Sequence, residues 1–228
     1  MARDMDYWEQ KTVQMYRIVF FALSSVLLFS CNAEKKKMVS LPYYNEPTFT
    51  PIFIKEKEKI EKKIKHKIAD FSLLNQDSKM ITQDFFKDKV HIANFIFTSC
   101  GSICPTMTSN LKIVNDSLKN DNDIVYLSYS VTPWIDKPNV LKKYKADYEI
   151  TNKNWQFLTG SKSKIYNLAR QSYFAEEDIG FSKDSTEFLH TEHFILVDKT
   201  SRIRGIYNGT LKFEMEQLLN DIKILKTE

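Results

Sequence analysis

The sequence predicts an α/β domain in which a central mixed sheet is flanked by helices. Two nearly continuous apolar runs, at residues 90–97 and 123–131, are typical of strands that are buried on both faces of a sheet. Segments with apolar residues at spacings of three and four follow these runs, which indicates amphipathic helices. Strands and helices that alternate pack as layers, and 228 residues with 43% apolar content are enough for one sizeable domain with extensions.

A small hairpin leads into this core. Residues 68–74 alternate like a strand, residues 75–79 have the polar composition of a turn, and residues 80–82 resume the strand pattern. The first buried strand follows at 90–97, and its His91 is expected to be a hydrogen-bonded edge residue rather than a ligand. The hairpin is therefore predicted to be an N-terminal extension of the sheet.

The remaining elements alternate along the chain. Pro138 stands in the first turn of one predicted helix, and Ser161 or Ser163 caps another. In chain order we expect a helix at 106–120, a strand at 123–131, a helix at 137–148, a strand at 155–160, a helix at 161–173, a hairpin of strands at 193–198 and 203–207, and a final helix at 211–225. This order fits a thioredoxin-like fold with insertions.

The positive charge is concentrated in one segment. The formal net charge is only +4, but residues 35–67 contain ten lysines and four glutamates, so the rest of the chain is close to neutral. This is not the composition of a nucleic-acid-binding protein. The lysine-rich residues 55–67 are expected to form a solvated edge or helix face with an exposed His66, and contact with an anionic membrane surface is the alternative.

The N-terminus has the features of an export signal. Residues 16–30 form an apolar stretch after a short basic lead, and this stretch is too short to span a membrane comfortably. Residues 1–30 are therefore predicted to be a signal peptide. Residues 28–31 resemble a bacterial lipobox, in which the cysteine, here Cys31, becomes the acylated N-terminus. A signal anchor with an incidental cysteine is the alternative.

These features divide the chain into three parts. After the signal peptide, residues 31–67 are expected to be a lipid-anchored tether and charged linker, and residues 68–228 the folded domain. Acidic residues before Met15 leave open whether the chain starts there or at Met1. The predicted location is the cell envelope, with the domain anchored to a bacterial membrane and facing the periplasm, where disulfides can persist.

Cys100 and Cys104 carry the predicted chemistry. A buried strand that runs into a turn and then a helix delivers them to the carboxyl edge of the sheet, where ligand sites of open α/β folds lie. A spacing of four places both sulfurs on one side of a helical turn, and the N–H groups of the helix start favour thiolates. Such a pair can form a disulfide or bind a soft metal ion such as Cu(I), and a histidine ligand would admit Cu(II) or zinc.

Two histidines are available as a third ligand. His190 and His193 lie at the start of the apolar strand predicted for 193–198, so either one can reach the sheet edge opposite the cysteine loop. The residues alone do not choose between them.

Four segments carry a resemblance to a known family. They are FIFTSCGSICPTMT (95–108), SVTPWIDKPNVLKKY (130–144), NWQFLTG (154–160) and FLHTEHFILVDKTSRIRGIYNG (188–209). In sequence and order these segments resemble the SCO/SenC family, which comprises extracytoplasmic copper-binding proteins of thioredoxin-like fold associated with assembly of the copper A centre of cytochrome c oxidase. The resemblance implies that Cys100, Cys104 and His190 bind copper, with His193 as the second choice for the histidine ligand.

The chain departs from the family in the segment 130–138. This segment resembles the family pattern S-[IV]-D-P-x-R-D, but Thr132 replaces the first acid and Ile135 replaces the arginine, whereas Asp136 is kept. An acid near the metal loop can orient a ligand or receive a proton, so Asp136 is a candidate for support of the site. A helix N-cap before Lys137 is the alternative role for Asp136.

These observations favour a copper metallochaperone that binds copper through two cysteines and one histidine and delivers it to the copper A centre of cytochrome c oxidase. A thiol-disulfide oxidoreductase that reduces the cysteines of a copper protein, with Cys100 as nucleophile, is the alternative. A peroxiredoxin-like peroxidase is disfavoured because Phe97 stands where those enzymes have threonine.

Expected partners are the copper-binding oxidase subunit or another copper protein and, through the anchor, a membrane. We expect a monomer that binds no nucleic acid.

Overall fold

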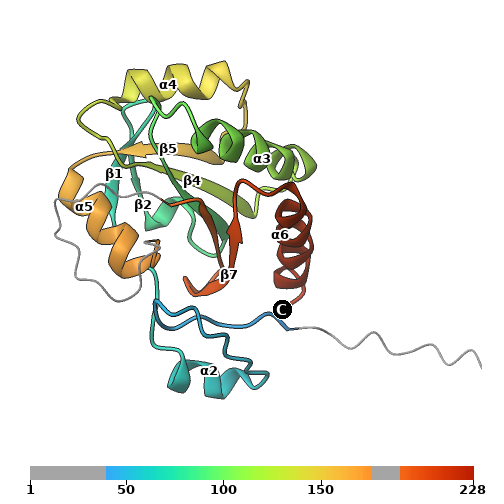
Figure 1. Cartoon of the computed structure of the whole chain (residues 1–228). Coiled ribbons are helices and arrows are strands. Elements are labelled where there is room, and N and C mark those ends of the chain that lie inside the picture. The colour runs from blue at the N-terminus through green and yellow to red at the C-terminus, as the bar shows by residue number, and fades with distance from the viewer. Residues whose placement is uncertain (1–39, 176–190) are drawn as a thin grey trace, which may run out of the picture. The chain divides into compact units, whose positions relative to one another are not determined.

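Seven strands form one mixed sheet in the order β2-β1-β5-β4-β3-β6-β7 (Figure 1). The computed structural model describes residues 40–175 and 191–228, so the predicted signal peptide, Cys31 and His190 lie outside the described residues. The strands are β1 (Ser72–Asn75), β2 (Met80–Thr82), β3 (Val90–Ile96), β4 (Ile124–Ser130), β5 (Trp155–Thr159), β6 (His193–Val197) and β7 (Ile203–Asn208).

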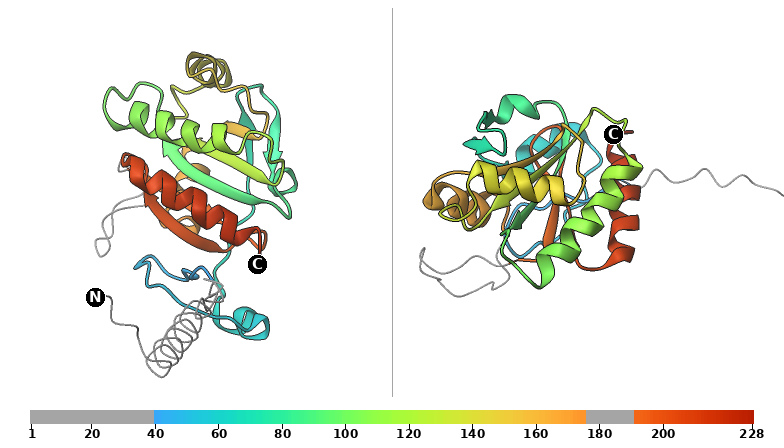
Figure 2. Two further views of the ribbon diagram at one scale, coloured as in Figure 1. Left: turned by 90° about the vertical axis from the view of Figure 1, so that its right-hand side faces the viewer. Right: turned by 90° about the horizontal axis from the view of Figure 1, so that it is seen from above.

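Helices cover both faces of this sheet. They are α3 (Ile103–Ser117), α4 (Pro138–Asp147), α5 (Lys162–Asn167) and α6 (Lys212–Leu225), with short turns η2 (Gln83–Phe85) and η3 (Leu168–Ser172). The short helix α2 (Lys57–Lys63), before β1, has no buried residue and covers neither face. One apolar core lies between the sheet and helices α3, α4 and α6, and a second core lies between the opposite face and α5 with η3 (Figures 1 and 2). The predicted α/β architecture with an N-terminal hairpin is confirmed.

The central strands are buried along their whole length. Every residue of β3, β4 and β5 is buried, as the continuous apolar runs predict. β3 and β4 are parallel, whereas β3 and β6 are antiparallel, so the sheet is mixed. The ends of β3 and β4 and the start of β6 therefore meet at one edge of the sheet.

Two helices differ from their predicted bounds. α3 begins at Ile103 rather than at 106, because Pro105 needs no backbone partner in the first turn of a helix. The helix predicted for 161–173 starts as expected, with the Ser161 side chain accepting from the Lys164 N–H at 3.2 Å, but it widens into a π-turn at Leu168–Ser172. The wider turn places Tyr173 in the second core.

Two histidines lie in other surroundings than predicted. His91 is not an edge residue, because β3 lies between β4 and β6 and buries it completely. Its Nε2 lies 3.1 Å from the hydroxyl of Tyr173, while its Nδ1 has no hydrogen-bond partner among the described residues. His66 is half-buried rather than exposed, with Nε2 2.7 Å from the Ser172 carbonyl oxygen and its ring 4.1 Å from that of Phe174.

Candidate metal centre

The cysteine loop, residues 97–102, lies at the carboxyl edge of the sheet. β3 and β4 are paired in register from Val90 with Ile124 to Ile96 with Ser130, so the loops that follow both strands start side by side. A hydrogen bond of 2.8 Å from the Val131 N–H to the Ile96 carbonyl extends this pairing beyond the strands. The predicted position of the site at this edge agrees with the general placement of ligand sites in such sheets.

Cys100 and Cys104 lie together in this loop and the helix that follows it. Cys100 is half-buried and closes a turn, its N–H donating to the Phe97 carbonyl at 3.2 Å. Cys104 is in the first turn of α3 and is only 3% exposed. Both are free thiols, and they lie near enough to each other that each shifts the pKa of the other. The structure thus brings the two sulfurs together, as the spacing of four predicts.

The two thiols have opposite electrostatic environments. Burial raises the pKa of Cys100, but the N–H groups of Cys104, Ser102 and Ile103 and the Cys104 thiol donate to its sulfur and hold the pKa below the usual range. Burial raises the pKa of Cys104 to about 12, and the neighbouring Cys100 and Asp136 add to this effect. Cys100 is therefore the more nucleophilic of the pair.

Asp136, in the loop between β4 and α4, supports the cysteine loop. Its carboxylate is completely buried and accepts from the Thr98 N–H at 3.2 Å and the Thr98 hydroxyl at 2.5 Å. The hydroxyls of Ser130 and Thr132 donate to the same carboxylate at 2.6 and 2.9 Å. No ion pair to Asp136 occurs within residues 40–175 and 191–228. Four neutral donors thus link the ends of β3 and β4.

The N-cap role considered for Asp136 is wrong. α4 is capped at Lys137, which makes no side-chain cap bond, and the Asp136 side chain points instead to the strand ends. Sequence reasoning also missed Thr98, Ser130 and Thr132 as donors. Their only signal was a set of hydroxyl residues directly after two apolar strands.

His193 lies at the start of β6, on a different face of the sheet from the sulfurs. Along β6, Phe194 and Leu196 belong to the same core as Cys104, whereas Ile195 and Val197 belong to the opposite core. Strand alternation therefore assigns His193 to the side of Ile195, away from α3. No group of three or more potential metal ligands occurs among the described residues, which do not include His190.

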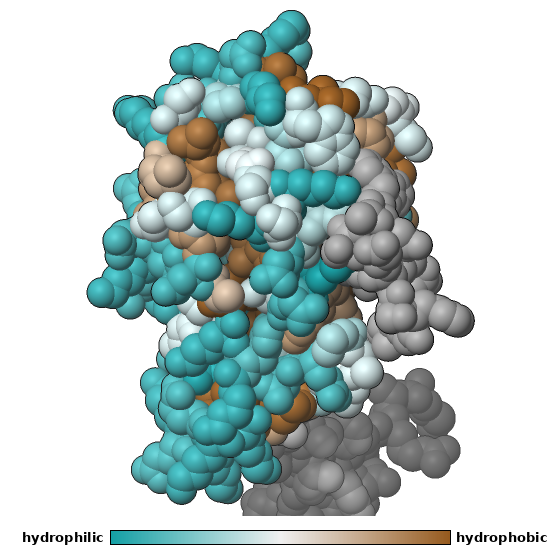
Figure 3. Space-filling view, turned by 90° about the vertical axis from the view of Figure 1, so that its left-hand side faces the viewer, coloured by the Kyte–Doolittle hydropathy of each residue, from teal (hydrophilic) through white to brown (hydrophobic). Residues whose placement is uncertain are grey.

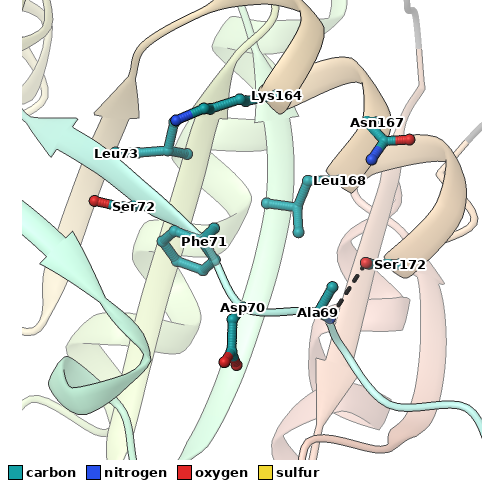
Figure 4. A pocket seen from close by; sticks show the side chains of 9 residues that line it. All are labelled: Ala69, Asp70, Phe71, Ser72, Leu73, Lys164, Asn167, Leu168 and Ser172. Atoms are coloured by element: carbon teal, nitrogen blue, oxygen red, sulfur yellow. Dashed lines mark hydrogen bonds between the residues drawn. The ribbon is translucent and has the colours of Figure 1, made fainter.

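A separate cavity of about 340 Å³ lies away from the cysteine loop. Residues 69–73 line one side of it, and residues of α5 and η3 line the other (Figure 4). The Ala69 N–H donates to the Ser172 hydroxyl at 3.2 Å across its end. No predicted site residue lines this cavity.

The donor atoms in this loop suit a soft metal ion. Two neighbouring thiols, one of them with a lowered pKa, are ligands that Cu(I) prefers over hard cations. A protein-family model described as SCO1/SenC matches residues 59–226. The chain belongs to the SCO1/SenC family. The resemblance stated from the four sequence segments is thereby confirmed.

Relatives within the SCO1/SenC family include both curated proteins and solved structures. The SCO1 protein homolog of Bacillus subtilis is 34% identical over 172 residues, which cover 75% of this chain and 88% of that protein. A SCO1/SenC family lipoprotein from Bacillus anthracis is 29% identical, with a TM-score of 0.62 over 71% of this chain and 95% of that one. The thioredoxin-like fold of Sco proteins is thus the fold of this chain.

Two further structures bear on the chemistry of the family. BsSco is 33% identical, with a TM-score of 0.60 over 71% of this chain and 94% of that one, and is described as a cytochrome c oxidase assembly protein with a disulfide switch. ScoI of Bradyrhizobium japonicum, solved with copper bound, is 24% identical with a TM-score of 0.55 over 69% of this chain and 98% of that one, which shows a shared fold. In the described residues, no helix is long and apolar enough to cross a membrane.

Proposed function

We propose that this chain is a copper metallochaperone of the cell envelope that serves the assembly of cytochrome c oxidase. The observation that carries the proposal is the pair of neighbouring free thiols, Cys100 and Cys104, at the carboxyl edge of the sheet. Two thiolates select Cu(I), and an added imidazole admits Cu(II). The copper-bound and oxidase-assembly relatives support this chemistry.

His190 is the proposed third ligand, and His193 is the second choice. The family resemblance assigns the ligand to His190, six residues before Leu196. The alternation of β6 supports the same choice, because it directs His193 toward the core on the other side of the sheet from Cys104. Asp136 acts on the site through Thr98, two residues before Cys100, and so positions the loop rather than binding copper itself.

Copper is the cargo, and transfer requires a partner to reach the cysteine loop. Trp134 and Ile135 follow β4 next to this loop and are 49% and 48% exposed. Exposed apolar side chains of this size are common anchors in protein interfaces. The proposed partner, the copper-binding subunit of the oxidase or another copper protein, contacts this edge and takes the ion by exchange of ligands.

A thiol-disulfide oxidoreductase is the second candidate function, and the unequal thiols favour it. The Cys100 thiolate attacks a partner disulfide, which breaks the partner's S–S bond and forms a mixed disulfide. Cys104 then loses its proton and attacks Cys100, so that the partner leaves with two thiols and this chain keeps an intramolecular disulfide. The disulfide switch described for BsSco supports this possibility.

The location of the chain is part of the proposal. Residues 1–30 act as a lipoprotein signal peptide, Cys31 carries the lipid, and residues 31–67 connect it to the copper-binding domain at 68–228. The lipoprotein from Bacillus anthracis supports this assignment. The domain then faces the periplasm from a bacterial membrane.

A transfer assay tests the proposed function. Copper-loaded chain is mixed with a copper-free copper A domain, and the visible spectrum of the assembled centre is recorded. We expect transfer from the wild type, with free copper at equal concentration as the control for unassisted loading. A chain that takes up no stoichiometric copper contradicts the proposal. A mixed disulfide trapped in Cys104→Ser, without copper transfer by the wild type, favours the oxidoreductase.

A further inference from the structure

Residues 40–67, named here the N-terminal layer, form a small folded unit beside β7. Tyr43 and Ile52 exchange two backbone hydrogen bonds of 2.9 Å, which pair the two arms of the segment. Tyr43, Ile54 and Ile64 are buried together as a small core. The layer therefore presents a defined surface.

Two buried arginines fix the layer to the sheet. Arg204 of β7 donates to the Leu41 carbonyl at 2.8 Å and the Pro42 carbonyl at 3.0 Å, and its guanidinium lies 3.9 Å from the centre of the Tyr43 ring. Arg202 forms an ion pair of 2.8 Å with Glu61. These contacts set the orientation of the layer relative to the sheet.

The layer lies at the opposite end of β3 from the cysteine loop. It contacts the turn between β6 and β7 through the Glu61–Arg202 ion pair, and the start of β7, where the Tyr44 N–H donates to the Ile203 carbonyl at 3.1 Å. Val197, just before this turn, pairs with His91 at the start of β3, whereas the cysteine loop follows its end. The seven residues of β3 span about 23 Å.

The layer is basic, whereas the domain beyond it is not. Residues 55–67 contain seven lysines, all exposed, and three glutamates, while residues 68–228 contain 20 basic and 21 acidic residues. Of these lysines, Lys55, Lys57, Lys62 and Lys63 form no ion pair in the described part of the chain. Phe53, just before this segment, is 69% exposed. Hydrophilic side chains cover most of the lower end of the view in Figure 3, with a few apolar ones between them.

Chain length keeps this layer close to the membrane. Ser40 stands nine residues after Cys31, the proposed lipid attachment site, and ten after the end of the apolar run at 16–30. Nine residues reach at most about 30 Å when fully extended. A lipid anchor and a signal anchor therefore both hold the layer within reach of the membrane surface.

We propose that the N-terminal layer docks on an anionic phospholipid surface, with its lysines against the headgroups and Phe53 in the interface. Lysines beside an exposed aromatic residue are the features of membrane-surface segments, and anionic lipids supply the complementary charge. Docking through this end directs the cysteine loop away from the membrane, toward a partner's copper domain. This proposal rests on the membrane anchoring in the proposed function.

Tryptophan quenching in vesicles tests the docking and its direction. The full chain is reconstituted into phosphatidylcholine vesicles with or without phosphatidylglycerol, and brominated lipid serves as the quencher. One variant carries Phe53→Trp with Trp8→Phe and Trp134→Phe, and the comparison variant carries only Trp8→Phe. The exposed tryptophan is then at position 53 in the first and at 134 in the second, while the buried Trp155 is common to both. We expect quenching at position 53 to be at least twofold stronger with anionic lipid, and no quenching of Trp134.

Matched lysine variants show whether lipid binding depends on the lysines of the N-terminal layer or only on the total positive charge of the chain. Replacing Lys55, Lys57, Lys62 and Lys63 by Gln is expected to abolish the quenching gained with anionic lipid. The control variant replaces four exposed lysines outside the layer by Gln: Lys79, Lys87, Lys153 and Lys164. It is expected to keep the quenching gained with anionic lipid. Equal quenching in both lipids, an unchanged response of the first variant, or quenching of Trp134 overturns the proposal. Copper content measured on the same samples shows separately whether the metal site is intact.

Discussion

Different kinds of interaction stabilise the structure around the two ends of β3. At the cysteine end, the single buried carboxylate of Asp136 accepts four hydrogen bonds from neutral groups, with no ion pair in the described residues. At the other end, Arg204 bonds two backbone carbonyls and forms ion pairs with Asp198 and Glu228 at 3.3 and 2.7 Å. The cysteine end depends on four hydrogen bonds to one carboxylate, and the other end depends on ion pairs and hydrogen bonds of a buried arginine.

This difference matches the tasks assigned to the two ends. A loop that binds and releases a metal ion must keep its sulfurs accessible, and Cys100 and the adjacent Trp134 are both partly exposed. An attachment surface must transmit its orientation to the rest of the domain, which the buried arginines achieve. We therefore expect substitutions at the cysteine end to change chemistry more than stability, and substitutions at the arginine end to do the reverse.

The largest effect is expected from loss of a sulfur. Cys100→Ser should lower copper affinity by more than the roughly 10–100-fold that loss of an outer-sphere partner costs, because a direct ligand is removed. Since Cys100 is only half-buried, the free energy of unfolding should change little. Copper titration and denaturant unfolding of the same variant measure both quantities. A destabilised variant that still binds copper tightly contradicts the assignment of chemistry to this end.

Arg204→Met should cause the largest loss of stability. Removing one partner of a buried ion pair costs about 3–5 kcal/mol, and here Asp198 and the Leu41 carbonyl lose their donor. Copper affinity should stay within a factor of two. Chemical denaturation checks the stability, with Lys199→Met on the adjacent turn as the exposed control. A loss below about 1 kcal/mol means that the arginine cross-link is not what holds the layer.

Asp136→Asn should weaken copper binding by about 10–100-fold. The amide group has one acceptor oxygen where the carboxylate has two, so the N–H and hydroxyl of Thr98 and the hydroxyls of Ser130 and Thr132 cannot all donate to it. The spectrum of the copper complex reports on the geometry of the cysteine loop. If Asp136 only stabilises the fold, the variant keeps the wild-type spectrum. Exposed Asp84→Asn serves as the control. Wild-type affinity and spectrum in Asp136→Asn exclude a positioning role.

At neutral pH the smallest effect is expected from the buried His91, and it grows as the pH falls. Burial lowers the pKa of His91 from 6.5 to about 3, so between these values the unfolded chain binds a proton that the folded chain does not. His91 therefore reduces stability as pH falls from 6.5 toward 3, by up to about 1.4 kcal/mol per pH unit, and has no such effect above 6.5. Unfolding curves of the wild type and His91→Gln across this range measure the difference. Parallel pH profiles contradict it.

The fold was predictable because its strongest signals are local. The apolar runs of β3 and β4 indicate buried strands regardless of context, and the helix spacing after Cys104 is regular. The start of α3 at Ile103 precedes the predicted start at 106, because Pro105 fits the first turn of a helix and does not mark its boundary. The buried position of His91 was missed because burial depends on the antiparallel neighbour β6, which is distant in sequence.

The site was predictable only in part, for the same reason. The spacing of Cys100 and Cys104 places both sulfurs on one helical turn, so their proximity follows from local geometry. The bonds of Asp136 to Thr98 join residues 38 positions apart and depend on the pairing of β3 with β4. The prediction of an N-cap role for Asp136 used only its neighbours in the sequence, whereas its hydrogen bonds depend on the tertiary structure.

Copper titration of His190→Ala and His193→Ala, recorded by visible spectra, tests the central claim most directly. The account predicts that wild type binds one copper ion per chain, that His190→Ala loses the wild-type spectrum and binds more weakly, and that His193→Ala keeps both. Wild-type spectrum and affinity in His190→Ala, with their loss in His193→Ala, would contradict the assignment of Cys100, Cys104 and His190 as the copper site.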